Sequence, residues 1–288
     1  NSLKSSKITN TVSKIINQVK KGRDSSLLKL TNKYENNNFK SIKEIQVSKK
    51  QVDDSLRLCS KEFISSTKIA IKRIKSYQKK LLPQDFIYKD KTGTKLGCLW
   101  KPINSCGLYV PGGKAIYPSS VYMNAVAAKL AGVKRIVLVS PAREKKISPE
   151  ILAAAKLSGV DEIFMVGGAQ AVAALTYGTK TIKSVDKIFG PGNAFVAEAK
   201  KQVFGDVGID SVAGPSEVTI IADKSCNPEW IAVDLLSQAE HDEDARVILV
   251  SDSLALISSV NKFIHKYLKV LDRKTIALQS IKNNGIAI

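Results

Sequence analysis

Residues 135–177 read RIVLVSPAREKKISPEILAAAKLSGVDEIFMVGGAQAVAALTY. Short apolar runs at 135–139 and 162–166 alternate with longer stretches at 149–158 and 169–177 in which apolar residues have helical spacing. The short runs predict buried strands and the longer stretches predict helices. Because strands that alternate with helices form βαβ units, this segment predicts a parallel sheet covered by helices on both faces.

The same alternation continues on both sides of this segment. The runs RIVLVS and RVILVS, about 110 residues apart, are nearly the same strand repeated, which suggests two similar α/β lobes. The other expected strands are GLYV (107–110), KIF (187–189) and VTIIA (218–222), and the other expected helices are 119–132, 193–204 and 228–240.

The region before Gly107 has a different pattern. Residues 1 to about 84 space their apolar side chains by three and four, which predicts helices ended by Pro83. Residues 85–106 predict a short hairpin that turns at Thr92-Gly93. We therefore expect N-terminal helices and a hairpin over 1–106, a first α/β lobe over 107–222, and an incomplete second lobe over 223–288.

Composition limits the class of protein. The chain has 288 residues, 44% of them hydrophobic and 25% charged, as in ordinary globular proteins. No signal peptide or membrane span is recognisable, and the four cysteines form no C-x-x-C pair, so we expect a soluble cytoplasmic protein with free thiols. The chain starts without methionine and stops inside an expected strand at 286–288, so we expect it to be truncated at both ends.

The net charge of +19 raises the possibility of a nucleic-acid partner. However, the lysines are scattered along the chain, and aromatic residues, on which bases would stack, make up only 6% of it. We therefore do not expect nucleic acid to be the partner, although a basic nucleic-acid-binding protein stays an alternative.

Four glycine-rich turns are expected at the ends of apolar runs: VPGGKA (110–115), VGGAQA (166–171), FGPGNA (189–194) and VAGPSE (212–217). Ligands of open parallel sheets bind where such turns lie, and free N–H groups at a helix start favour an anion such as a pyrophosphate. Together the turns predict a cleft of cofactor size.

Several polar residues beside these turns could contact a ligand or serve the structure alone. Tyr109 either stacks on a flat ring or packs with its hydroxyl satisfied, and Gln170 either contacts a ligand or caps a helix. Asn193 is placed to cap the next helix, and Ser216 is a turn residue that faces the same end of the sheet. The Cys106 thiol could add to an aldehyde, but a buried small apolar side chain is the simpler reading.

The stretch DLLSQAEHDEDA (234–245) holds His241, one of two histidines in the chain. Gln238 and His241 are three residues apart near the end of an expected helix, so their side chains share a face. They could be two ligands of a zinc ion, or His241 could simply be favoured by the helix dipole. The other histidine, His265, lies on an amphipathic helix and is expected to be structural.

The motifs together resemble one family, histidinol dehydrogenase, over nearly the whole chain. They occur in the same order and spacing: GLYVPGG (107–113), GGAQAVAALTYGT (167–179), FGPGNAFVAEAK (189–200), VGIDSVAGPSE (207–217) and DLLSQAEHD (234–242).

The resemblance implies an α/β fold of two related Rossmann-like lobes with parallel sheets, preceded by an N-terminal helical segment. It implies oxidation of L-histidinol to L-histidine through L-histidinal, the last steps of histidine biosynthesis, with two NAD⁺, a zinc ion and a homodimer. The matching residues are Gln238 and His241 for zinc and substrate, Ser216 for substrate, and Tyr109, Gln170 and Asn193 for NAD.

The resemblance also has gaps. The family's Glu-His acid/base pair and its two other zinc ligands, an Asp and a His, would lie beyond Ile288, so no residue of this chain is assigned as catalytic. Ala127 stands where the family often has proline. The open alternatives are a metal-free NAD-dependent alcohol or aldehyde dehydrogenase and an inactive truncated relic.

Overall fold

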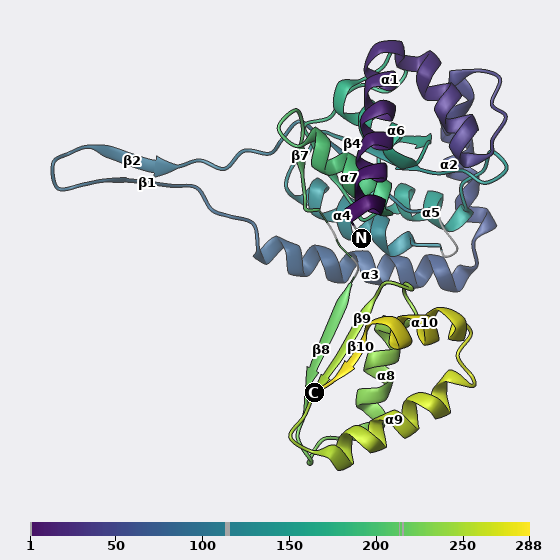
Figure 1. Ribbon diagram of the computed structural model, residues 1–288. Helices are drawn as coiled ribbons and strands as arrows, with labels where there is room; N and C mark the ends of the chain where they lie inside the picture. The colour runs from purple at the N-terminus through teal and green to yellow at the C-terminus, as the bar shows by residue number, and fades with distance from the viewer. Residues whose placement is uncertain (1, 113–115, 213, 215) are drawn as a thin grey trace. The chain divides into compact units, whose positions relative to one another are not determined.

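The structure is a computed structural model that describes residues 2–112, 116–212, 214 and 216–288. It contains two compact units, Asn1–Val212 and Ala213–Ile288, each with its own sheet and its own core of buried apolar side chains. The elements of the first unit, most of which are labelled in Figure 1, follow in chain order. They are α1 (Ser2–Glu35), the 3₁₀ helix η1 (Ile42–Ile45), α2 (Lys49–Leu58), α3 (Lys61–Lys80), β1 (Phe86–Lys89), β2 (Lys95–Cys98), β3 (Ser105–Tyr109), α4 (Pro118–Leu130), β4 (Arg135–Ser140), α5 (Pro149–Ser158), β5 (Glu162–Met165), α6 (Gly168–Tyr177), β6 (Lys187–Phe189), α7 (Ala194–Val203) and β7 (Gly208–Ile209).

The main sheet of the first unit has the strand order β5-β4-β3-β6-β7, and all its neighbours are parallel. The chain builds outward from β3 through β4 to β5 and then returns to place β6 on the other side of β3. This is the order of a Rossmann-type sheet, in which a crevice opens where the strand order reverses, here between β3 and β6. The expected α/β fold with a parallel sheet is confirmed.

Helices cover both faces of this sheet. Helices α4 and α5 pack together with α2 and α3, while α6 and α7 pack together with α1. Strands β3 and β4 are buried along almost their whole length, which is why their sequences are continuously apolar. Helix α5 begins at Pro149 after the Ser148 cap and ends at Gly159, whose φ of +80° suits glycine, so the expected helix at 149–158 is confirmed.

The N-terminal helices differ in two places from a simple helical reading. Helix α1 is interrupted at Arg23, where φ is +48° and ψ is −128°, and the Arg23 guanidinium donates to the carbonyl oxygens of Tyr177 and Gly178 at 2.6 and 2.8 Å. The continuous apolar pattern over 52–82 divides into α2 and α3 because Cys59 is extended and the Ser60 hydroxyl caps α3. No helix in the described ranges is long and apolar enough to cross a membrane.

The expected hairpin is present as β1 and β2, which pair antiparallel and extend away from the rest of the first unit (Figure 1). Gly93 in its turn has a φ of +87°, as the Thr92-Gly93 prediction requires. Phe86, Tyr88 and Leu96 are all more than 40% exposed, so the hairpin presents apolar side chains to solvent.

The second unit contains a three-stranded parallel sheet in the order β10-β9-β8. This order matches the β5-β4-β3 half of the first sheet, so the expected relation between the two lobes is confirmed. The elements of this unit are β8 (Glu217–Ile221), α8 (Pro228–Ala239), β9 (Arg246–Val250), α9 (Leu254–Leu268), α10 (Lys274–Asn284) and β10 (Gly285–Ala287).

The boundaries between parts of the chain differ from those expected at 106/107 and 222/223. The N-terminal helices belong to the first unit because α1 packs on α6 and α7. Strand β8 belongs to the second unit because it pairs with β9 along its length, from Glu217↔Arg246 to Ile221↔Val250. Packing partners in the first case and hydrogen-bonded partners in the second, both distant in the sequence, decide these assignments.

Candidate functional site

Three of the glycine-rich turns follow β3, β5 and β6, so they lie together at the carboxyl edge of the first sheet. Gly190, after β6, has a φ of +111°, and a Cβ atom built on it would lie 2.1 Å from the Tyr109 carbonyl oxygen. Only glycine allows this approach between the turns on either side of the switch point. Gly113, Lys114 and Ala115 of the first turn, and Ala213 and Pro215 of the fourth, lie outside the described residues.

Tyr109 and Gln170 both lie beside Gly168 at the start of α6. The Gly168 N–H donates to the Tyr109 hydroxyl at 3.0 Å, and burial raises the pKa of this hydroxyl to about 12, so it stays protonated. A Cβ built on Gly168 would lie 2.6 Å from Gln170 Oε1, so this oxygen lies against the turn. Gln170 is 1% exposed, and its Oε1 has no hydrogen-bond partner in the described part of the chain.

Buried acceptors in proteins nearly always have a hydrogen-bond donor, and ligands bind at this edge of such a sheet. A bound ligand would therefore account for the missing donor. The Gln170 amide therefore fits a ligand that donates a hydrogen bond. The Tyr109 ring, by contrast, is 4% exposed and packs in the core of the first unit. This agrees with the second interpretation of the sequence, in which the ring packs and its hydroxyl is satisfied.

Glu35, the last residue of α1, reaches the same place from the N-terminal region. Its Oε1 accepts hydrogen bonds from the Gly167 N–H at 2.7 Å and from Gln170 Nε2 at 3.2 Å, and its Oε2 accepts from the Ala142 N–H at 3.2 Å. Burial raises the pKa of this carboxyl to about 7, and the three hydrogen bonds act to lower it. Sequence reasoning missed Glu35, because nothing near it in sequence marks it as part of this edge.

Asn193 caps α7 as expected, since its side-chain oxygen accepts from the N–H groups of Phe195 and Val196 at 3.0 and 3.1 Å. The turn before it is held by an ion pair that the sequence did not reveal. Lys200, in the last turn of α7, pairs with Asp210 and donates to the Gly190 carbonyl at 3.0 Å. Asp210 in turn accepts from the Gly190 N–H at 2.8 Å, so both polar groups of Gly190 are fixed.

A cavity of about 680 Å³ opens at the carboxyl ends of β3, β4 and β5. Gly112, Ser140 and Pro141 line it from the sheet, and residues of α2 and α5 line its other side. The Ser140 hydroxyl is fully buried and has no partner among the described residues. The carboxyl edge of the first sheet thus carries both space and unfilled hydrogen-bonding groups.

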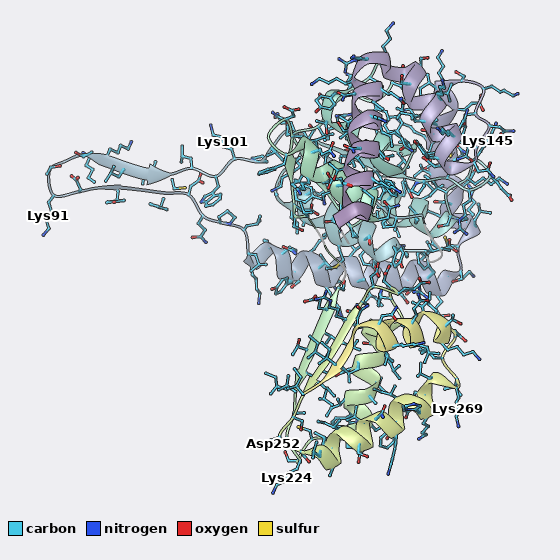
Figure 2. The ribbon with its side chains drawn as sticks, in the orientation of Figure 1. Lys91, Lys101, Lys145, Lys224, Asp252 and Lys269 are labelled. Carbon is cyan, nitrogen blue, oxygen red and sulfur yellow. The ribbon has the colours of Figure 1, made fainter. Side chains whose placement is uncertain are left out.

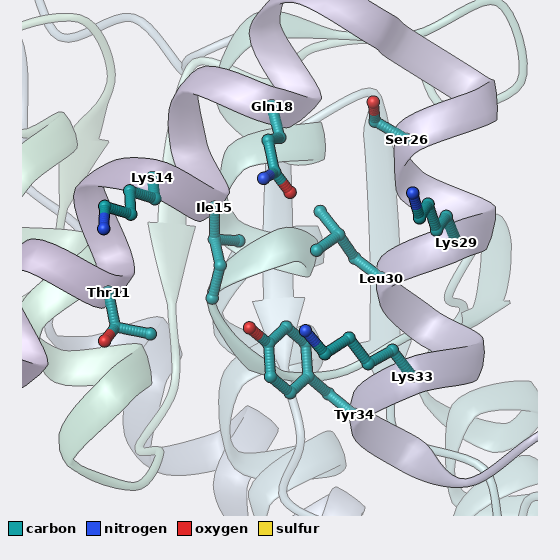
Figure 3. A pocket seen from close by; sticks show the side chains of 9 residues that line it. All are labelled: Thr11, Lys14, Ile15, Gln18, Ser26, Lys29, Leu30, Lys33 and Tyr34. Atoms are coloured by element: carbon teal, nitrogen blue, oxygen red, sulfur yellow. The ribbon is translucent and has the colours of Figure 1, made fainter.

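A second cavity of about 530 Å³ lies between the two arms of α1 (Figure 3). Lys14, Lys29 and Lys33 line it, and all three are exposed to solvent. The cavity borders none of the residues that the sequence singled out.

The other predicted site residues belong to the second unit. Ser216 immediately precedes β8, and its carbonyl accepts from the Arg246 N–H at the start of β9 at 3.1 Å. Helix α8 ends at Ala239, and the His241 N–H donates to the Gln238 carbonyl at 3.1 Å, so both residues lie at the carboxyl end of this helix. Gln238 is half-buried and His241 is exposed.

Gln238 and His241 offer an amide oxygen and an imidazole nitrogen, a donor pair that suits zinc. A zinc site takes at least three protein ligands. Residues 2–112, 116–212, 214 and 216–288 contain no group of three or more His, Cys, Asp or Glu side chains that could hold a metal. The pair therefore fits as part of a zinc site whose remaining ligands these residues do not supply.

Two further predictions concern residues away from these sites. Cys106 is fully buried, and burial raises the pKa of its thiol to about 11, so it is a small packed side chain and not a nucleophile. His265 is exposed on α9, and its Nδ1 lies 2.8 Å from the Asn261 carbonyl oxygen. Figure 2 labels lysines on separate elements, from the hairpin turn (Lys91) to the end of α9 (Lys269), in keeping with a scattered basic charge.

Comparison with known proteins places the whole chain in one family. The family model described as histidinol dehydrogenase matches residues 1–288. The chain is 48% identical to the histidinol dehydrogenase of Rhizobium meliloti over 95% of this chain and 63% of that protein. It is 47% identical to histidinol dehydrogenase 1 of Nostoc sp. over 98% of this chain and 64% of that protein.

The fold agrees with a solved structure of the same family. The crystal structure of histidinol dehydrogenase from Elizabethkingia anophelis matches 97% of this chain with a TM-score of 0.92 and 36% sequence identity. The match covers 64% of that chain, so the present chain spans a little under two thirds of the length of these relatives. The chain belongs to the histidinol dehydrogenase family.

Proposed function

We propose that the protein oxidises L-histidinol to L-histidine through L-histidinal, with NAD⁺ as the oxidant and a zinc ion in the site. Membership of the family supports this activity. The observation that carries the proposal is the unpartnered Gln170 Oε1 at the carboxyl edge of the Rossmann-type sheet, because it leaves an acceptor ready for a ligand where dinucleotides bind.

In this proposal the first unit binds NAD. Gln170 accepts a hydrogen bond from the nucleotide, and the Tyr109 hydroxyl fixes the Gly168 backbone beside it. Asn193 holds the start of α7 in a shape that leaves the turn after β6 open to the ligand. The paired Lys200 and Asp210 keep this turn rigid, and rigid turns lower the entropy lost when a ligand binds.

The second unit binds the substrate. Gln238 and His241 hold zinc from the carboxyl end of α8, and Ser216 contacts the substrate from the segment before β8. When bound, zinc would fix the imidazole and amine of histidinol, and NAD⁺ would accept hydride in each of two oxidations. Holding the substrate at a fixed point keeps the aldehyde from escaping between the two oxidations. No described residue is assigned as the general base.

The test compares the purified full-length protein with its His241→Ala variant. Zinc content, measured by inductively coupled plasma mass spectrometry, and histidinol-dependent NADH formation should be lost together in the variant, and chelator should abolish the activity of the parent. The variant His265→Ala is the matched control, because His265 is exposed on another helix and should keep zinc and activity. Full turnover of His241→Ala with normal zinc would contradict the zinc assignment. Chelator-insensitive activity in the parent would favour a metal-free dehydrogenase.

We also propose that the protein is a cytoplasmic homodimer. All four cysteines are free thiols, as a reducing compartment requires. The hairpin supports the dimer: Phe86, Tyr88, Leu96 and Cys98 share one face by their register, while the opposite face carries Ile87, Lys89 and Lys95. An isolated two-stranded hairpin is marginally stable in water, so an apolar face of this kind gains from cover by a second chain.

Light scattering after size exclusion tests the dimer. Tyr88→Ser should raise the dimer dissociation constant by about tenfold or more, because it removes apolar area from the face that would be covered. Lys89→Ser, on the opposite face of the same strand, should leave it unchanged. A parent that is monomeric at every concentration would rule out the dimer.

A further inference from the structure

Glu35 joins three segments that are far apart in the sequence. It comes from the end of α1 and accepts hydrogen bonds from Ala142 after β4, Gly167 after β5 and the side chain of Gln170 in α6. These bonds hold the backbone after β4 and the backbone after β5 close to each other. The carboxylate therefore lies under the turns that form the proposed nucleotide site.

We propose that Glu35 is a positioning residue for nucleotide binding, which holds the Gln170 amide and the turns after β4 and β5 in the arrangement that receives NAD. This inference rests on the proposed function, since it takes Gln170 to contact the nucleotide.

The first argument concerns the orientation of the Gln170 amide. Its Nε2 donates to Glu35 Oε1 at 3.2 Å, and this bond determines that the amide nitrogen faces α1. The amide oxygen is then turned against Gly168 and stays without a partner in the described chain. A carboxylate accepts hydrogen bonds and does not donate them, so ionised Glu35 fixes the amide in one of its two orientations. The result is a buried acceptor, without a partner among the described residues, held beside the turn after β5.

The second argument concerns the cost of this carboxylate. Burial raises its pKa to about 7, which means that the folded chain is less stable when Glu35 is ionised. An apolar residue or an amide would avoid this cost. Strongly perturbed carboxyl groups are typical of functional sites, where a stability cost is retained because the group does something else.

The competing explanation is that Glu35 only anchors α1. Helix α1 has other anchors, however, since Arg23 donates to the Tyr177 and Gly178 carbonyls and Asp24 accepts from the N–H and hydroxyl of Thr181 at 3.3 and 3.0 Å. Its apolar face also contributes Val12, Val19 and Leu27 to the core. Asp24 thus offers a matched control, because it is a carboxylate of the same helix that, among the described residues, bonds to Thr181 and not to the turns after β4 and β5.

The experiment measures NAD⁺ binding to the full-length protein by isothermal titration calorimetry at pH 8, for the parent, Glu35→Ala, Glu35→Gln and Asp24→Asn. We expect Glu35→Ala to weaken binding by about tenfold or more, the effect of losing one fixed hydrogen bond together with the order of the turns. Glu35→Gln keeps the size and one acceptor and should have an intermediate affinity. Asp24→Asn should bind like the parent. Steady-state kinetics should show a raised KM for NAD⁺ with kcat within about twofold of the parent.

Each outcome decides between the explanations. Parental affinity in both Glu35 variants, with or without a lower melting temperature, would show that the residue only anchors α1 and would overturn the inference. If Glu35→Ala does not fold, Glu35→Gln gives the decision alone, because its amide fits the same space. If the parent itself does not bind NAD⁺, the proposed function fails and the inference fails with it, whereas a binding parent isolates the role of Glu35.

Discussion

Replacing Glu35 with glutamine should make the protein more stable at pH 8 and leave its stability at pH 5 almost unchanged. The carboxyl has an ordinary pKa of 4.5 and a folded-state pKa of about 7 because of burial. Between these two values the unfolded chain releases the proton and the folded chain keeps it, so a rising pH favours unfolding. Above pH 7 Glu35 is ionised in both the folded and the unfolded chain, and the folded chain then bears the full destabilisation from the buried charge. The folded pKa is raised, so the stability present at low pH is lost as the pH rises.

The size of this effect follows from the pKa values. One pKa unit corresponds to about 1.4 kcal/mol, so a rise from 4.5 to about 7 destabilises the ionised folded chain by about 3 kcal/mol. Between pH 5 and pH 8 the parent should therefore lose about 2 to 3 kcal/mol relative to Glu35→Gln, which does not titrate. At pH 5 the neutral acid and the amide present similar groups to Gly167 and Ala142, so the two proteins should differ by about 1 kcal/mol or less.

The assay is urea unfolding followed by far-ultraviolet circular dichroism at pH 5 and pH 8, at constant ionic strength. The midpoint difference between variant and parent should grow by about 1 M urea between the two pH values, for an m-value typical of a domain of this size. Glu44→Gln is the control. Partial desolvation acts to raise the pKa of Glu44, but the hydrogen bond and charge of Lys145 hold it below its ordinary value, so Glu44 is ionised at both pH values. If the urea midpoints of the parent and Glu35→Gln differ by the same amount at pH 5 and at pH 8, the argument that burial raises the pKa of Glu35 is refuted.

Three further changes test the framework of the first unit. Lys200→Met removes the partner of Asp210 and the bond to the Gly190 carbonyl, and should lower the free energy of unfolding by about 2 kcal/mol, or the melting temperature by about 6 °C. An unchanged melting temperature would show that the pair is not needed. Asn193→Ala should cost about 1 kcal/mol through the lost cap and weaken NAD⁺ binding, whereas Asn193→Ser, which restores the cap, should recover both the stability and the affinity. Gly107→Ala would place a Cβ 2.7 Å from a methyl of Leu175 and should destabilise by about 1 to 3 kcal/mol, and adding Leu175→Val should recover part of this loss if overpacking is the cause.

Much of the secondary structure could be predicted because its signals are local. The strand at Arg135–Ser140 is a continuous apolar run, and the helix at Pro149–Ser158 has its serine cap, its proline and its closing glycine within the segment itself. The break between α2 and α3 at Cys59-Ser60 was not predicted, because the apolar spacing continues across it and only the backbone shows the interruption.

The site could be predicted only in part. Gln170 and Asn193 stand beside glycine turns, and a polar residue at the start of a helix is a recognisable signal. Lys200 and Asp210 looked like ordinary charged residues, and their role at Gly190 depends on the place where α7 and β7 bring them. The domain boundaries also depended on pairing, since β8 joins the sheet of β9 and not the sheet that precedes it in sequence.

The sequence by itself determined the alternation of strands and helices, the hairpin turn at Thr92-Gly93 and the family, because each is written in residues that are close together or in fixed order. Only the tertiary structure decided that the last residue of α1 lies under the turns after β4 and β5. Backbone N–H groups carry no mark in the sequence, so a buried carboxylate that binds them from more than 100 residues away can be found only when the chain is folded.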